Sequence, residues 1–125
     1  MKIKTGIDIV EIKRIEKCIH RFGDRFLNRV FTDKEIKYCE SKNKLRFQHY
    51  AGRFSAKEAA FKAVSQFFDN KYEISWKDIE ILNDNNGKPH LHILNLESEK
   101  IIDIDISISH CNSHAISNVV ILYKE

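Results

Sequence analysis

Residues 45–68 read LRFQHYAGRFSAKEAAFKAVSQFF, and this stretch decides the fold. Its apolar side chains recur every three or four residues, which is the spacing of one face of an α-helix. They are Phe47, Tyr50, Ala51, Phe54, Phe61, Val64 and Phe68. The stretch therefore predicts a long helix whose apolar face packs on a hydrophobic core.

The segments before this helix predict a strand and two shorter helices. Apolar and other residues alternate over 3–10, which is the period of a strand. Helical spacing then runs from about Val10 to the break at Gly23, and a short apolar segment follows. Residues 32–35 form a capping box that opens a second helix through about Ser41, and residues 41–44 form a polar link.

The segments after the long helix predict strands. They lie at 72–76, 79–82, 91–93, 102–108 and 115–123, with an Asn-Gly turn within 83–89 and another turn at 110–114. Because helices come early and antiparallel strands come late, the predicted fold class is α+β, with the long central helix packed on an antiparallel β-sheet.

The composition predicts one domain spanning residues 1–125. Apolar residues make up 42% of the chain, and there is one proline. No apolar run is long enough to span a membrane, and the first residues lack a secretory pattern. The three cysteines are widely spaced, so we expect a reducing, cytoplasmic location. The net charge of +3 permits an acidic partner.

Glu58 interrupts the apolar face of the long helix, four residues after Phe54 and three before Phe61. An ionised carboxylate on a buried face is costly unless it is paired or bound to a metal. The alternative is that Glu58 leans outward and pairs with Lys62, one turn along the helix.

Asp8 lies in the first predicted strand, between Ile7 and Ile9, although aspartate is unfavourable in strands. The alternative is a helix N-cap, because residues 8–11 fit the pattern D-x-x-E. Mg²⁺ is usually held by one or two carboxylates together with substrate phosphates. Asp8 and Glu58 together are therefore a candidate magnesium site.

Basic residues flank Glu58 on the same helix, at Arg53, Lys57 and Lys62. Cations beside a metal-binding carboxylate suit a polyphosphate ligand. The alternative is a solvated helix face. His110 ends a predicted strand, where ligand-binding residues are frequent, and its alternative is an ordinary surface position.

Four segments resemble the signatures of the holo-acyl-carrier-protein synthases, in the same order. They are residues 6–15 (GIDIVEIKRI), 51–63 (AGRFSAKEAAFKA), 86–89 (NGKP) and 107–110 (SISH). The resemblance covers nearly the whole chain, and the length suits the small bacterial-type class of the 4′-phosphopantetheinyl transferase superfamily.

This resemblance implies a transferase that supports fatty acid biosynthesis and lipid metabolism. It would move 4′-phosphopantetheine from coenzyme A (CoA) to a serine of an apo acyl carrier protein, and adenosine 3′,5′-bisphosphate would leave. It implies Mg²⁺ held by Asp8 and Glu58. The metal would bridge the pyrophosphate and neutralise developing charge.

The resemblance also implies the residues that meet the substrates. The catalytic residues would be Glu58 and Lys62. The implied CoA contacts are Arg53, Lys57, Lys62, Gly87, Pro89 and His110. Candidates for the base are Glu58, a metal-bound water and Glu35, and the water is preferred.

The resemblance further implies a homotrimer with active sites between subunits. Residues 102–108 and 119–122 could supply an apolar interface or ordinary core. Acyl carrier proteins are acidic, so the predicted docking group is Arg14, Arg21 and Arg25. The alternative for these arginines is a solvated helix face.

Two other functions compete with the transferase. A nucleic-acid-binding module would use the basic residues near 34–46, but no recognised binding motif is present, and 18 acidic residues offset 21 basic ones. An inactive CoA-binding scaffold is disfavoured because both Asp8 and Glu58 are intact.

Overall fold

The computed structural model describes residues 1–68, 74–94, 96 and 99–125. Its strands are β1 (Lys2–Glu11), β2 (Ile79–Asn83), β3 (Pro89–Ile93), β4 (Ile101–His110) and β5 (His114–Tyr123). Its helices are α1 (Ile12–Phe22), α2 (Asp24–Val30), α3 (Asp33–Glu40) and α4 (Arg46–Val64). Short 3-10 turns are η1 (Asn43–Leu45), η2 (Ser65–Phe67) and η4 (Trp76–Asp78).

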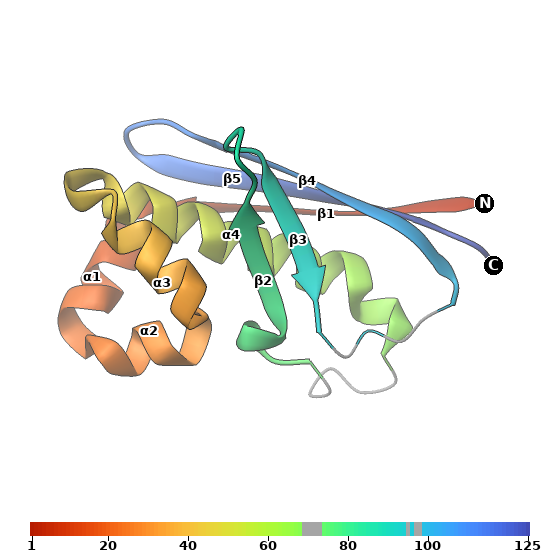
Figure 1. Cartoon of the computed structure of the whole chain (residues 1–125), viewed down its shortest axis with the longest axis horizontal. Helices are drawn as coiled ribbons and strands as arrows, with labels where there is room; N and C mark the ends of the chain where they lie inside the picture. Colours follow the sequence, from red (N-terminus) through yellow and green to blue (C-terminus); the bar gives the residue numbers. More distant parts are fainter. Residues whose placement is uncertain (69–73, 95, 97–98) are drawn as a thin grey trace.

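The main sheet has the strand order β1-β5-β4, and both pairs are antiparallel. The first strand of the chain therefore lies beside the last, with Asp8 opposite Ser117. Strands β2 and β3 form a separate antiparallel pair. Figure 1 shows α4 running along the main sheet, so the predicted α+β class with a long central helix on an antiparallel sheet is confirmed.

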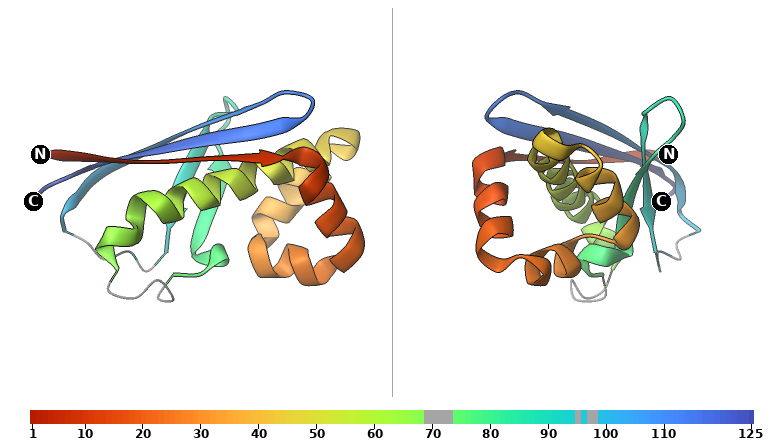
Figure 2. Two further views of the ribbon diagram at one scale, coloured as in Figure 1. Left: turned by 180° about the vertical axis from the view of Figure 1, so that it is seen from behind. Right: turned by 60° about the vertical axis from the view of Figure 1, so that its left-hand side comes forward.

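Small side chains form the buried side of α4. Ala56, Ala59, Ala60 and Ala63 are fully buried, while Phe54 and Phe61 are only half-buried. The predicted apolar stripe is therefore buried only in part, because Tyr50, Ala51 and Val64 are fully buried but its phenylalanines are half-buried at the edge of the core. Because alanines let the backbones come close, α4 lies tightly against β1 and β5, as the views in Figure 2 show.

The closest approach of α4 to the sheet is at Gly6 of β1. A Cβ atom on Gly6 would lie 1.9 Å from the carbonyl oxygen of Ala59. A side chain at this position cannot be accommodated without moving backbone. Gly6 therefore sets the separation between the strand that carries Asp8 and the helix that carries Glu58.

The outer face of β1 is apolar and uncovered in the single chain. Ile3, Ile7 and Ile9 are 67%, 59% and 62% exposed, and Ile116 on the adjacent β5 is 38% exposed. The inner face, with Gly6 and Val10 buried, lies against α4. The isoleucines of this first strand thus point away from the core, so this face is a surface that another molecule could cover.

The three short helices gather at one end of α4 (Figure 1). Gly23, at φ +55°, separates α1 from α2, as expected for a glycine break. The predicted capping box of α3 is confirmed, because the Thr32 side chain accepts from the amide of Glu35, and Glu35 accepts from the amide of Thr32. The short apolar segment after Gly23 is helix α2.

Three predicted boundaries differ from the structure. The long helix ends at Val64 and continues as η2, so it is shorter than 45–68. The polar link after α3 ends in the 3-10 turn η1. Residues 74–76 are not in a strand, since Trp76 begins η4, and the rest of the strand predicted at 72–76 lies outside the described residues.

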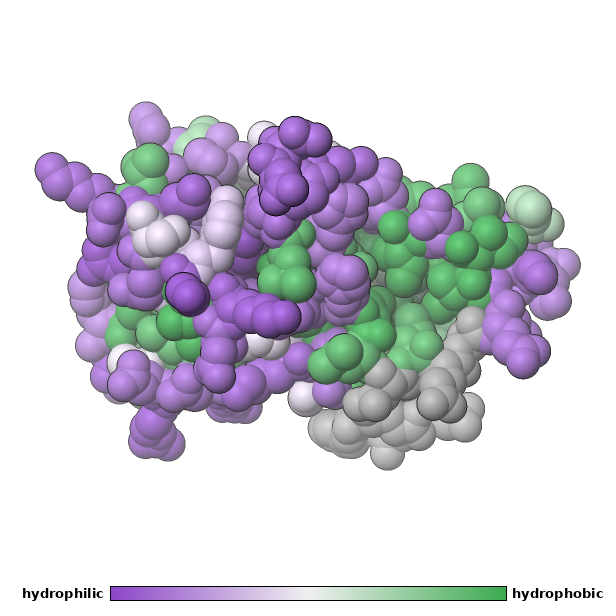
Figure 3. Space-filling model, viewed as in Figure 1, coloured by the Kyte–Doolittle hydropathy of each residue, from purple (hydrophilic) through white to green (hydrophobic). Residues whose placement is uncertain are grey.

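Polar side chains dominate the α1–α3 end of the molecule in Figure 3, and apolar ones gather toward the other end. Within the part of the chain that the structure describes, no helix is both long and apolar enough to cross a bilayer.

Candidate functional site

Asp8 and Glu58 line one pocket, although they come from β1 and α4. Asp8 belongs to the face of β1 that carries Gly6 and Val10, because side chains alternate along a strand. Since Gly6 draws β1 onto α4, the two carboxylates lie at the seam between strand and helix. The prediction that these carboxylates come together is thus matched by their placement.

Glu58 is held in a partly desolvated, negatively charged environment. Burial raises its pKa, the nearby charge of Asp8 raises it further, and the ammonium group of Lys62 partly offsets both. A carboxylate in this position is stabilised by any cation that neutralises the pair. The electrostatics therefore favour a bound cation between Asp8 and Glu58.

The hydrogen bonds of Lys62 go to β1, and among the described contacts it forms no ion pair with Glu58. Its Nζ donates to the carbonyl oxygen of Ile7 at 2.9 Å and lies 3.4 Å from Oδ1 of Asp8. The helical pairing of Glu58 with Lys62 is therefore not the arrangement in this structure. The N-cap alternative for Asp8 is also wrong, because the N-cap of α1 is Glu11 and Asp8 lies within β1.

The donor set at this seam fits a divalent cation that keeps other ligands. Two carboxylates supply hard oxygen atoms, which Mg²⁺ prefers. Among the described residues, no group of three or more His, Cys, Asp or Glu side chains could hold a metal. A cation here would thus complete its coordination from water or from substrate oxygens.

Lys57 lies away from this pocket, contrary to its predicted contact with CoA. Its side chain is fully buried, 2.7 Å from Oε1 of Glu35, and it donates to the carbonyl oxygens of Val30 and Trp76 at 2.7 and 3.0 Å. Burial lowers the pKa of Lys57, while the Glu35 carboxylate opposes this. The ammonium group is enclosed by protein partners, so it is not placed to meet a ligand.

Glu35 is the centre of a buried junction and is not placed to act as the base. It is fully buried, and its oxygens accept from the amides of Thr32 and Ile81 as well as pairing with Lys57. The junction ties α3, α4 and β2 together. Glu35 therefore has a structural role that extends beyond the predicted cap.

Four of the other predicted CoA residues line a second pocket, whereas Lys62 lies beside Asp8. They are Arg53, Gly87, Pro89 and His110. Arg53 is 4% exposed, and its guanidinium lies 4.1 Å over the ring of Tyr38 and donates from Nη2 to Asn83. Its buried Nε has no hydrogen-bond partner within the described parts of the chain. Gly87, at φ +81°, lets the turn between β2 and β3 close beside this pocket.

The two pockets lie on opposite flanks of α4. Asp8 is on the edge strand β1, whereas His110 ends the other edge strand β4, and β5 runs between them. Helix α4 packs over β1 and β5, so it stands between the pockets on that side of the sheet. The helix pattern placed Arg53 and Glu58 beside one ligand within one chain, and only the family resemblance implied active sites between subunits.

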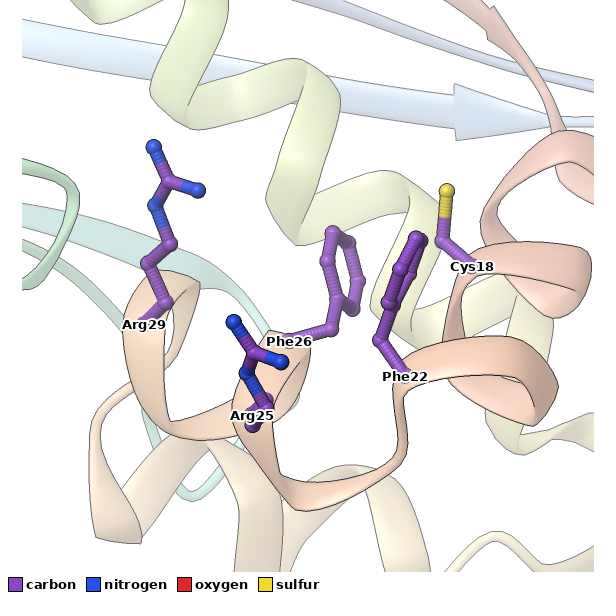
Figure 4. A pocket seen from close by; sticks show the side chains of 5 residues that line it. All are labelled: Cys18, Phe22, Arg25, Phe26 and Arg29. Carbon is purple, nitrogen blue, oxygen red and sulfur yellow. The ribbon is translucent and has the colours of Figure 1, made fainter.

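The predicted docking arginines lie on α1 and α2, and two of them line pockets. Arg14 lines the carboxylate pocket itself, and Arg25 lines a neighbouring pocket between α1 and α2. Figure 4 shows Phe22 and Phe26 in the pocket between α1 and α2, with Arg25 and Arg29 extending from α2. Arg21 is exposed on α1, with its guanidinium 5.2 Å from the centre of the Phe22 ring.

Sequence reasoning missed several residues of these surfaces. Arg29 and the exposed Phe22 line the pocket between α1 and α2 together with Arg25, and His49 and Asn83 line the Arg53 pocket. An exposed phenylalanine next to arginines was a usable signal for Phe22. His49 carried no signal, because its position depends on how α4 turns against β4.

Three comparisons relate this geometry to known proteins. The profile of the 4′-phosphopantetheinyl transferase superfamily matches residues 4–119. A holo-[acyl-carrier-protein] synthase of Protochlamydia amoebophila is 48% identical over 117 residues, covering 92% of this chain and 93% of that protein.

Solved structures are similar over nearly the full length. One is a holo-(acyl-carrier-protein) synthase from Bacillus anthracis in complex with CoA (3′,5′-ADP), at 39% identity, TM-score 0.77 and 94% coverage of both chains. Another is the Helicobacter pylori enzyme in complex with coenzyme A, at 35% identity and TM-score 0.79, covering 94% of this chain and 99% of that one.

Proposed function

Because this chain belongs to the 4′-phosphopantetheinyl transferase superfamily, we propose that it transfers 4′-phosphopantetheine from CoA to a serine of an apo acyl carrier protein. The relatives named holo-[acyl-carrier-protein] synthase, at up to 48% identity, support the activity. The main observation that supports a catalytic site at particular residues is that Asp8 and Glu58 line one pocket and Lys62 lies beside Asp8.

In this proposal Asp8 and Glu58 hold Mg²⁺. When bound there, the metal would supply positive charge that neutralises the charge developing on the leaving group. Lys62 adds a positive charge beside Asp8, where it stabilises a phosphate oxygen. Glu35 is enclosed by its partners, so the serine proton passes to Glu58 or to a water beside it.

Arg53, Gly87, Pro89 and His110 bind the nucleotide end of CoA in this proposal. The unpaired Nε of Arg53 supports an anionic ligand, because a buried donor without a partner costs about 1–3 kcal/mol. The released product is adenosine 3′,5′-bisphosphate. Lys57 is left out of the CoA contacts because its ammonium group is buried against Glu35.

The acidic carrier protein docks on α1 and α2 in this proposal. Arg14, Arg21 and Arg25 attract it, and Phe22 supplies apolar contact. Arg14 and Cys18 lie at the carboxylate pocket, so a carrier bound here could present its serine to Asp8 and Glu58. Raised salt should then increase the KM for the carrier more than the KM for CoA.

We further propose a homotrimer with active sites between subunits, one domain per chain, and a cytoplasmic location. The uncovered isoleucines of β1 support an interface on the outer sheet face. The separation of the two pockets by α4 supports a shared site, since one CoA could contact the carboxylate pocket of one subunit and the Arg53 pocket of the next.

Mass spectrometry tests the activity. Apo acyl carrier protein incubated with the chain, CoA and Mg²⁺ should gain the mass of one phosphopantetheine group, and a carrier with serine replaced by alanine should not. Asp8→Ala or Glu58→Ala should lower turnover by about 10²–10³-fold with the fold intact, whereas Asp33→Ala, an exposed acid on α3, should not. No mass gain with the unchanged chain would refute the transferase.

Mixing two inactive variants tests the shared site. In an assembly where each site takes one pocket from each neighbour, refolding Asp8→Ala together with Arg53→Ala should restore about a quarter of the wild-type activity. Each variant refolded alone should stay inactive. No recovery on mixing would place both pockets' functions within one chain.

A further inference from the structure

His49 lies in the same pocket as Arg53 and His110. Its ring is 5.6 Å from the ring of Tyr38 on α3 and 6.4 Å from the ring of His110 at the end of β4. It is half-buried, so it contacts both neighbouring elements while one side faces the pocket. The second imidazole therefore adds a possible proton donor to a site already containing a guanidinium.

The charges around His49 are all positive. Arg53 is on its own helix, Lys42 follows α3, and His110 comes from β4, while Tyr38 of α3 packs on its ring. Strands β2 and β3 contribute Asn83 and Pro89, and none of the described residues lining the pocket carries a carboxylate. The pocket is thus suited to an anion.

Burial lowers the pKa of His49, and the charges of Arg53, Lys42 and His110 lower it further. Without a ligand, the imidazole is therefore neutral near pH 7. An anion with two negative charges would reverse this balance, because it attracts the protonated ring and offsets its cationic neighbours.

We propose that His49 is an additional ligand of the 3′-phosphate of CoA and takes up a proton when that phosphate binds. This rests on the proposed function for the identity of the nucleotide. Imidazolium then donates to a phosphate oxygen, in the same way as the free Nε of Arg53. The pocket should therefore distinguish CoA from 3′-dephospho-CoA, and more strongly as the pH falls.

Calorimetry with adenosine 3′,5′-bisphosphate tests this without Mg²⁺ or carrier protein. At pH 7.5, titrations in two buffers of different ionisation enthalpy give the number of protons taken up per bound ligand. The phosphate is almost fully ionised at this pH, so it contributes little. Wild type should take up a sizeable fraction of a proton, and adenosine 5′-monophosphate, which lacks the 3′-phosphate, should cause none.

Substitution of the ring separates His49 from the rest of the pocket. His49→Gln should remove most of the proton uptake and weaken bisphosphate binding about tenfold. His114→Gln is the matched control. His114 begins β5, across the turn from His110, but does not line the pocket, so this variant should behave as wild type.

Equal proton uptake in wild type and His49→Gln, or equal uptake with both nucleotides, would overturn the proposal. Should His49→Gln fail to fold, equal uptake with the two nucleotides on the wild-type chain would still overturn the proposal. The transferase is tested separately by carrier modification, so a chain that modifies the carrier but shows no phosphate-linked uptake refutes the role of His49 alone.

Discussion

Lys57 and Glu58 are adjacent in the chain, yet their side chains leave α4 in different directions. Lys57 enters the core and meets Glu35, whereas Glu58 faces the pocket that it shares with Asp8. One helix thus carries a structural cation and a candidate metal ligand at consecutive positions. Substitution of Lys57 should therefore lower the stability of the fold, whereas substitution of Glu58 should lower turnover.

Replacing Lys57 with methionine should destabilise the fold. The change leaves the Glu35 carboxylate buried without its cation, which costs about 3–5 kcal/mol of unfolding free energy. Urea denaturation measures this loss. Lys62→Met is the matched control, because Lys62 is exposed, and it should change stability by less than about 1 kcal/mol while impairing transfer. Wild-type stability of Lys57→Met with a raised KM for CoA would instead indicate a ligand contact.

Cys111 should be the reactive thiol of the native protein. Hydrogen bonds from the side chain and backbone of Ser113 and from the backbone of His114 lower its pKa to about 7, whereas burial raises that of Cys39 to about 12. Because the thiolate is the nucleophile, alkylation by iodoacetamide should rise with pH through a midpoint near 7. Cys111→Ser should remove this reaction, and a midpoint near 9.0 would contradict the prediction.

At this scale the sequence identified the residues that break a pattern. Asp8 and Glu58 were recognisable because carboxylates are unexpected in an alternating strand and on an apolar helix face. The burial of Lys57 was not recognisable from the sequence. Its partner Glu35 already fits a local capping pattern, which gives no sign of a second role.

Among the elements, the contact between β1 and α4 positions the candidate metal site. Gly6 and the buried alanines allow this approach, and large apolar residues take little part in it. Sequence periodicity gives most weight to large side chains, so it found the helix and part of its buried surface but missed the alanine face. The pairing of β1 with β5 could not be predicted either, since no local sequence pattern specifies a partner strand so distant in the chain.

Gly6→Ala should separate β1 from α4 or unfold the chain. The new Cβ would clash with the Ala59 carbonyl, and overpacking of this kind costs about 3 kcal/mol or more when backbone must move. Gly52→Ala is the control within α4, where the Cβ would meet only a methyl group of Ile108 at 3.1 Å. Thermal unfolding compares the two variants. Equal midpoints would show that β1 moves away from α4 at little cost in stability.

The molecule as a whole presents two candidate ligand pockets and one uncovered apolar sheet face. The carboxylate pocket and the Arg53 pocket flank α4, and the isoleucines of β1 lie on the outer side of the sheet. A proposed homotrimer accounts for both observations. The sequence motifs gave the order of the site residues along the chain, but which pocket each residue joins depends on the packing of α4.

Ile116→Asp should weaken the assembly. Ile116 is 38% exposed in the single chain, so a charge there costs the monomer little, but burial at an interface should weaken association on the order of a hundredfold. Light scattering after size-exclusion chromatography gives the mass. Leu45→Asp, exposed on η1 away from the sheet, should leave the mass unchanged. A smaller species with full transfer activity would contradict a shared site.

The tight seating of β1 on α4 at Gly6 has an evolutionary consequence. Because main-chain atoms meet there, substitutions of bulky residues elsewhere in the interior should change the spacing of Asp8 and Glu58 little. Related sequences can then differ widely in their other hydrophobic residues and keep the same spacing of the two acids, provided that position 6 has no side chain and the α4 alanines stay small.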